Sequence, residues 1–149
     1  MVSLIEITNA MTAKLQSIPE LVALLDSIVG YVDENPERNS ISNAIYGMPA
    51  GSLLVVWNGT TLEAASTMEA WIHVLQIYVR ARRGDSPLAV IDALMDGIPV
   101  PGDGLRWRYC PIMDGVLPTV VRDVVRLIDE EGIDYYAVTT FTQETGDTE

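Results

Sequence analysis

The chain has 149 residues, 48% hydrophobic and 20% charged, which predicts one globular domain spanning residues 1–149. Twenty-one acidic residues against nine basic ones give a net charge of −12, which disfavours sequence-independent binding to nucleic acid or to an anionic membrane. A single cysteine excludes an internal disulfide framework, and no apolar run is long enough to cross a bilayer.

The first thirty residues predict an amphipathic helix in two pieces. Ser3 and Glu6 have the spacing of a capping box, and apolar residues then recur every three or four positions as far as Ile18. Pro19 suits the first position of a second helical piece, which we expect to end near Val29, before Gly30.

Residues 31–51 lack a clear hydrophobic period and are rich in Asn, Ser, Pro and Gly. We expect a mobile loop, or a surface loop that contains a short strand. Its few apolar residues, Ile41, Ile45, Tyr46 and Met48, are too sparse to repay the entropy of ordering it in an isolated subunit.

From Ser52 the hydrophobic period changes to two. Residues 53–57 predict a buried strand, and Asn58-Gly59 predicts a tight turn from which residues 60–65 return as a second strand. Residues 71–83 predict the longest strand. We expect its core-facing side chains to be Trp71, His73, Leu75, Ile77, Val79 and Ala81.

The rest of the chain predicts a helix and a closing hairpin. Ser86-Pro87 opens a helix that Gly97 ends, and residues 106–113 are compatible with a further strand. Residues 120–129 and 133–144 predict two strands joined by a turn, followed by a frayed tail at 145–149. This order predicts an α+β fold: a mostly antiparallel sheet with an N-terminal amphipathic helix and a second helix packed on one face.

Single residues give no signal for catalysis, a cofactor or a metal. His73 lies on the apolar side of its strand, which favours a core histidine, and Cys110 has the surroundings of a buried thiol. No G-x-S-x-G elbow occurs, and one histidine with one cysteine cannot build a zinc site. We therefore expect a protein that is not an enzyme.

The arginines are the candidates for a subunit interface. Arg80, Arg82 and Arg83 end the longest predicted strand, and arginine is suited to paired hydrogen bonds with the carboxylates that an acidic copy offers. A solvated strand end is the alternative. Because Tyr135 and Tyr136 are adjacent in one strand, one of them must face away from the core. The predicted interface set is Arg80, Arg82, Arg83, Tyr46, Met48 and Tyr136.

The order of these segments resembles the tail terminator proteins of long-tailed bacteriophages, also called tail completion or minor tail proteins. The resemblance covers nearly the whole chain and is carried by an amphipathic N-terminal helix, "GSLLVVWNG", "WIHVLQIYVRA", a helix after "SP", and "YYAVTTFTQETGD". No invariant motif carries it, and residues 31–51 and the Asn58-Gly59 turn depart from it.

The resemblance implies an α+β subunit that forms a ring, typically of six copies. Such a ring caps the tail tube, stops its growth and docks on the head connector, so its partners are itself, the tail tube protein and a head-completion protein. DNA would pass through the ring without specific binding. The implied location is the virion tail, and the host cytoplasm during assembly. Two alternatives stay open: another head–tail joining or tail-tube subunit, or a small acidic cytoplasmic enzyme or regulator with a ligand pocket.

Overall fold

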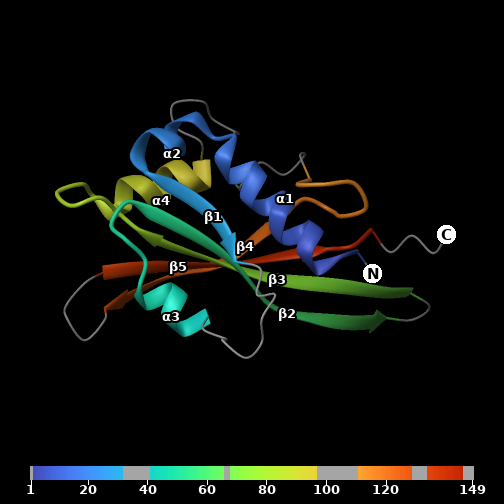
Figure 1. Cartoon of the computed structure of the whole chain (residues 1–149). Coiled ribbons are helices and arrows are strands. Elements are labelled where there is room, and N and C mark those ends of the chain that lie inside the picture. The colour runs from blue at the N-terminus through green and yellow to red at the C-terminus, as the bar shows by residue number, and fades with distance from the viewer. Residues whose placement is uncertain (1, 32–40, 66–67, 97–110, 129–133, 146–149) are drawn as a thin grey trace.

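The computed structural model describes residues 2–31, 41–65, 68–96, 111–128 and 134–145. Within these residues the chain forms helices and strands in the order α1, α2, β1, α3, β2, β3, α4, β4, β5 (Figure 1). Their bounds are Leu4–Gln16, Pro19–Leu24, Ser27–Tyr31, Ile41–Tyr46, Ser52–Ala65, Met68–Arg80, Pro87–Asp96, Val120–Ile128 and Asp134–Gln143.

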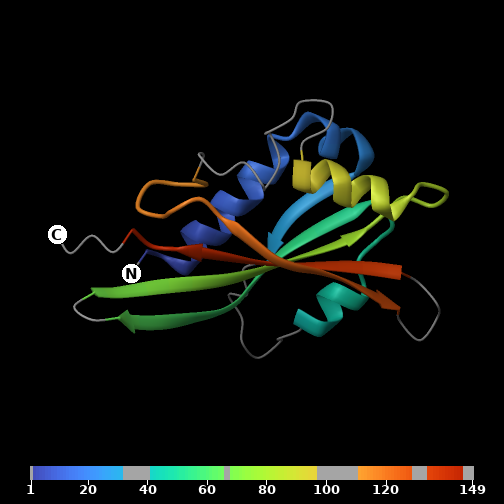
Figure 2. The ribbon, with the colours of Figure 1, turned by 180° about the vertical axis from the view of Figure 1, so that it is seen from behind.

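The strands form one five-stranded sheet in the order β1-β2-β3-β5-β4. The β1–β2 pair is parallel, and the β2–β3, β3–β5 and β5–β4 pairs are antiparallel. Figures 1 and 2 show α1, α2 and α4 on one face of this sheet and α3 on the other. The predicted α+β class, with a mostly antiparallel sheet, is confirmed.

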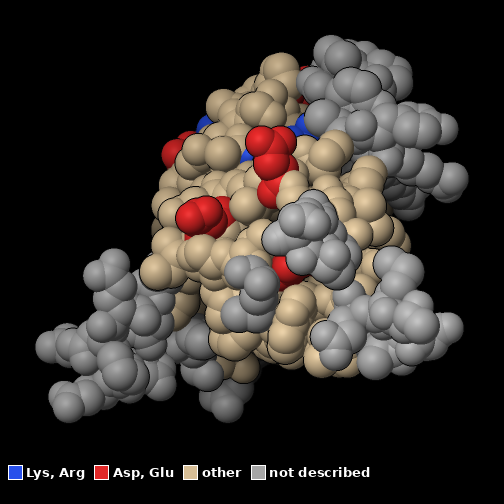
Figure 3. Space-filling view, turned by 90° about the vertical axis from the view of Figure 1, so that its right-hand side faces the viewer, with Lys and Arg blue, Asp and Glu red and all other residues tan. Residues whose placement is uncertain are grey.

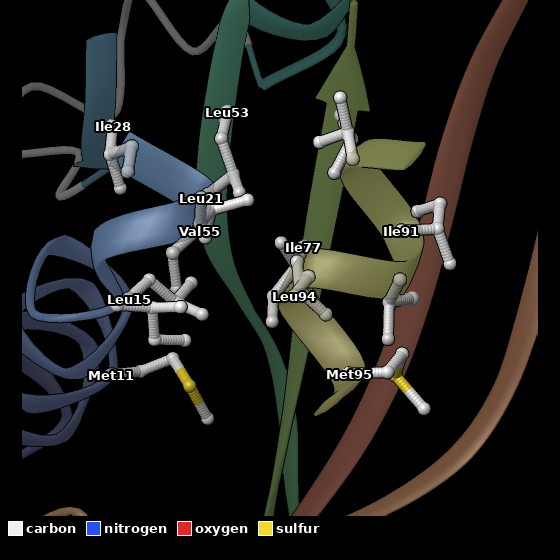
Figure 4. Packing of buried hydrophobic residues seen from close by; sticks show 14 of the residues in the cluster. Met11, Leu15, Leu21, Ile28, Leu53, Val55, Ile77, Ile91, Leu94 and Met95 are labelled. Atoms are coloured by element: carbon white, nitrogen blue, oxygen red, sulfur yellow. The ribbon is translucent and has the colours of Figure 1, made fainter. Parts of the chain in front are cut away.

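The main core lies between the sheet and the helices α1, α2 and α4. Met11 and Leu15 of α1 and Leu94 of α4 all point toward the same face of the sheet (Figure 4). This is the burial that the periods of about 3.6 in the helices and two in the strands predict. The sheet contributes Ile28, Leu53, Val55, Leu75, Ile77, Val79, Tyr136 and Val138.

A smaller core lies on the opposite face, under α3. It contains buried Met48, Leu54, Val56 and Tyr135, with Tyr31, Ala44, Ile45 and Tyr78 packed around them. Both faces of the sheet are therefore covered near the end at which β5 begins. Adjacent Tyr135 and Tyr136 are both buried because each belongs to a different core, so neither forms the exposed outer tyrosine that their adjacency predicts.

Several elements agree with the sequence predictions. The Ser3 hydroxyl accepts a hydrogen bond from the Glu6 amide at the start of α1, which is one half of a capping box. The closing hairpin is formed by β4 and β5, and β5 pairs with β3 in an antiparallel register that sets Leu75 beside Thr140. The helix after Ser86 covers one face of the sheet.

The prediction of helix as far as Val29 is wrong. The second helix ends at Leu24, Leu25 is extended, and Ser27–Tyr31 is the edge strand β1. Ile28 has a spacing that a helix could continue, but as a strand the segment pairs with the first five residues of β2. The main-chain pairing with β2, which is distant in the sequence, outweighs the local helical pattern of this segment.

The predicted hairpin turn at Asn58-Gly59 is also wrong. The strand β2 continues through this dipeptide to Ala65, and the register shifts there, so that Trp57 pairs with Leu75 while Gly59 pairs with Val74. Asn58 is thus the additional residue of a β-bulge, and the φ of +148° at Gly59 serves the bulge. A tight hairpin turn and a β-bulge both favour glycine, so the dipeptide Asn58-Gly59 does not distinguish between them in the sequence.

In the predicted loop 31–51, the described part holds the helix α3 and no strand beyond Tyr31. Residues 32–40, most of the predicted strand at 106–113, the turn at 130–132 and the tail beyond Thr145 lie outside the described residues. Residues 111–113 are described and do not belong to a strand.

Gly30 lets α1 approach β1. A Cβ atom at this position would lie 2.6 Å from Oγ1 of Thr12, closer than any relaxed contact. The Thr12 hydroxyl donates to the Thr8 carbonyl at 2.8 Å, which holds it in place. The helix therefore packs directly on the backbone of the edge strand.

We expect Gly30→Ala to lower the free energy of unfolding by about 1–3 kcal/mol, the usual cost of overpacking. The measurement is denaturant unfolding of Gly30→Ala, Thr12→Ala and the double variant. Because the second substitution removes the clashing oxygen, the double variant should recover most of the loss. Additive losses in the double variant would contradict this packing.

Candidate subunit interface

The arginines at the end of β3 are used largely within the chain. Nη1 of Arg80 donates to the carbonyl of Met48, and its guanidinium lies 5.8 Å from the centre of the Tyr135 ring. Arg80 thereby fastens the segment after α3 to the sheet. The place of Arg80 in a subunit interface stays a prediction, and its guanidinium already contacts Met48 and Tyr135 within the chain.

Arg82 ties the end of β3 to the connection between α2 and β1. Its Nε and Nη2 atoms lie 3.0 and 2.8 Å from Oδ1 of Asp26, and its Nη1 donates to the Ala23 carbonyl at 3.2 Å. Both charged side chains are well exposed, so the pair contributes at most about 1 kcal/mol. Arg83 is exposed and makes no ion pair among the described residues.

These arginines line a shallow hollow that also contains carboxylates. Its volume of about 280 Å³ lies below the roughly 300–1,000 Å³ usual for small-molecule pockets. The hollow is lined by residues from the end of β3 and the start of β5, which lie at the same end of the sheet. Its lining residues are Ala50, Arg80, Ala81, Arg82, Arg83, Asp85, Pro87 and Asp134.

Of the other predicted interface residues, only Tyr46 presents its side chain to solvent. It is 66% exposed, and its ring meets that of Tyr135 edge-on, with 6.4 Å between the centres. Met48 and Tyr136 are buried within the subunit's own cores. Burial, and then the neighbouring Tyr46, raise the pKa of the Tyr78 hydroxyl, which donates to Gln76 at 2.6 Å.

His73 is a core histidine, as the sequence predicts, and it is fully buried. Its Nε2 lies 2.7 Å from Oε2 of Glu144, and its Nδ1 lies 2.8 Å from the Thr60 hydroxyl. Because a carboxylate only accepts, Nε2–H donates to Glu144, and the Thr60 hydroxyl is the partner of Nδ1. Trp57 donates to the same hydroxyl at 2.9 Å, and the Val2 amide donates to Glu144 at 2.9 Å.

This network joins both ends of the chain to the β2–β3 pair. Hydrolases use a similar row of hydroxyl, imidazole and carboxylate. Here the ring is sealed from solvent, and the Thr60 hydroxyl already has both Trp57 and His73 as partners. The arrangement therefore favours a structural role.

Figure 3 views the end of the molecule where both termini lie. Among the described residues on this surface, acidic side chains are more prominent than basic ones.

The strand β4 is the surface that sequence reasoning missed. Every described residue of this edge strand except Val121 is exposed. Five of its nine residues are large exposed hydrophobics: Val120, Val124, Val125, Leu127 and Ile128. Natural sheets usually protect such edges, and contiguous apolar surface commonly marks an interaction site. The apolar run in VVRDVVRLI is visible in the sequence, but its exposure is not.

The charged residues of β4 face their own hairpin. Nη2 of Arg126 lies 2.9 Å from Oδ2 of Asp134, and this hydrogen bond, with the charge of Asp134, raises the pKa of the guanidinium. The Arg122 guanidinium lies 5.5 Å from the centre of the Phe141 ring. Apart from Val121, which packs against the main core, the apolar side chains of β4 are thus the exposed part of the strand that forms no such contact with a charged group.

Among the described residues, no group of three or more histidine, cysteine, aspartate and glutamate side chains could hold a metal ion. No described helix is both long and apolar enough to cross a membrane. No family model matches this chain, and no curated protein matches its sequence.

We expect His73→Ala to lower the free energy of unfolding by about 2–4 kcal/mol, because it leaves a cavity and two polar groups without their partner. Glu144→Gln is the matched control, since its amide oxygen can still accept from Nε2–H and from Val2. The measurement is denaturant unfolding at neutral pH. A loss below about 1 kcal/mol for His73→Ala would contradict a structural role for the network.

Proposed function

We propose that this chain is a structural subunit of a bacteriophage tail. Copies of it would form a ring that caps the tail tube, ends tail polymerisation and joins the tail to the head. The observation that carries the proposal is the edge strand β4, whose apolar side chains are exposed in the single subunit. The resemblance in element order to tail terminators supplies the biological setting.

A closed ring requires two different surfaces on each subunit, related by a rotation that returns to the start. The sheet offers two such surfaces, because β1 and β4 are its opposite edges and differ in length and side chains. A subunit with only one edge able to bind another copy would form a dimer and no larger assembly. Two unlike edges support a ring.

The net charge of −12 also suits a ring through which DNA passes. A basic lumen would hold the phosphate backbone, whereas an acidic one repels it. The proposed partners are further copies of this chain, the tail tube protein and a head-completion protein, and the proposed location is the virion tail after assembly in the host cytoplasm.

The direct test is the mass of the purified chain in solution, measured by sedimentation over a wide range of concentrations, with electron microscopy of the same samples. A tail terminator should give one closed species of several copies, with a visible central hole. Open fibres would favour the alternative of a tube-forming subunit, because a rotation that does not close gives a filament. A monomer at every concentration would contradict the proposal.

A further inference from the structure

We propose that β4 of one copy pairs with β1 of the next copy as an antiparallel strand, so that the sheets of neighbouring copies form one continuous sheet. This inference rests on the proposed ring, and it specifies which surfaces meet. The occupant of the apolar edge is therefore a second copy of this chain. Two features of the described residues favour this arrangement.

The first feature is strand direction. The strands β2, β5 and β1 run one way, and β3 and β4 run the other way. A neighbour in the same orientation therefore presents a β1 strand that runs opposite to β4. Antiparallel pairing follows without reversing the strand direction of the neighbour, and it uses the ladder geometry that is slightly more stable per residue. Both outer strands then have a partner on each side around the ring, and on β1 the Ile28 carbonyl also accepts from the Gln16 side chain of α1 at 2.8 Å.

The second feature is the match of side chains across the two edges. Val29 of β1 is 49% exposed and lies on the α3 side of the sheet, since its neighbours Ile28 and Gly30 face the helices. On β4, Val125 and Leu127 lie on this same side, because they pair with Ala137 and Tyr135. In a continuous sheet these three side chains share one face.

The helical side of the contact is matched as well. Val124 and Ile128 of β4 face that side and are exposed, Ile128 by 62%. In the neighbouring copy, α1 packs on β1 and exposes Ile5 on its surface. A neighbour's α1 can therefore cover β4 around Val124, whereas Ile128 lies at the end of the sheet where β5 begins.

A two-fold contact between two β4 strands is the competing arrangement. It would also bury the apolar edge, but it would leave both β1 strands open. The two arrangements predict different behaviour for variants that block one edge only.

The experiment uses two variants of the full chain. Val29→Glu blocks β1, and Val125→Glu with Leu127→Glu blocks β4; all three side chains are exposed, so folding should persist, which thermal unfolding checks. Leu88→Glu, at an exposed position of α4, is the matched control and should assemble as the unmodified chain does. The readout is sedimentation of each chain alone and of an equimolar mixture.

Each blocked variant alone should associate at least about tenfold more weakly than the unmodified chain, the effect of losing roughly 1.4 kcal/mol at a contact. The equimolar mixture should form a two-chain species that grows no further, because each chain retains one complementary edge.

Each other outcome is diagnostic. If the β1-blocked variant still dimerises alone, the contact is the two-fold β4 arrangement and the inference is wrong. If both blocked variants assemble like the unmodified chain, the ring proposal survives but its interface lies elsewhere. If the unmodified chain never associates, both proposals fail.

Discussion

The position of β3 inside the sheet constrains the rest of the structure. His73, Leu75, Ile77 and Val79 are buried on the helical face, whereas the alternating residues that end in Arg80 are only partly buried on the other. A shift of one residue would bring Arg80 into the main core, so the register with β2 and β5 is strongly fixed. With β2 on one side of β3 and β5 on the other, β1 and β4 are the two outer strands of the sheet.

The sequence was informative where local periodicity and burial agree. The start of α1, the strand β3, the helix α4 and the closing hairpin all have a pattern that matches their surroundings. The failures occurred where a distant partner decides the structure. Ser27–Tyr31 is a strand only because the first residues of β2 lie beside it, and Asn58-Gly59 forms a bulge only because β3 is long enough to continue past it.

The candidate interface was predicted less well than the fold, and for a similar reason. The arginines were chosen for their chemistry, but Asp26 and the Met48 carbonyl, which lie far from them in the sequence, already occupy Arg82 and Arg80. The exposed strand β4 escaped notice because VVRDVVRLI reads as an ordinary buried strand. Whether an apolar strand is covered depends on where the helices pack, which periodicity alone does not reveal.

The central claim is that both sheet edges of this chain are completed by neighbouring copies. Hydrogen exchange of the backbone amides, measured on dilute and on assembled samples, tests it most directly, because an open edge exposes amides that a paired edge protects. Exchange should slow in β1 and in β4 together as the chain assembles, with little change in β3. Slowing in β4 alone, or in neither edge while the chain assembles, would contradict the claim.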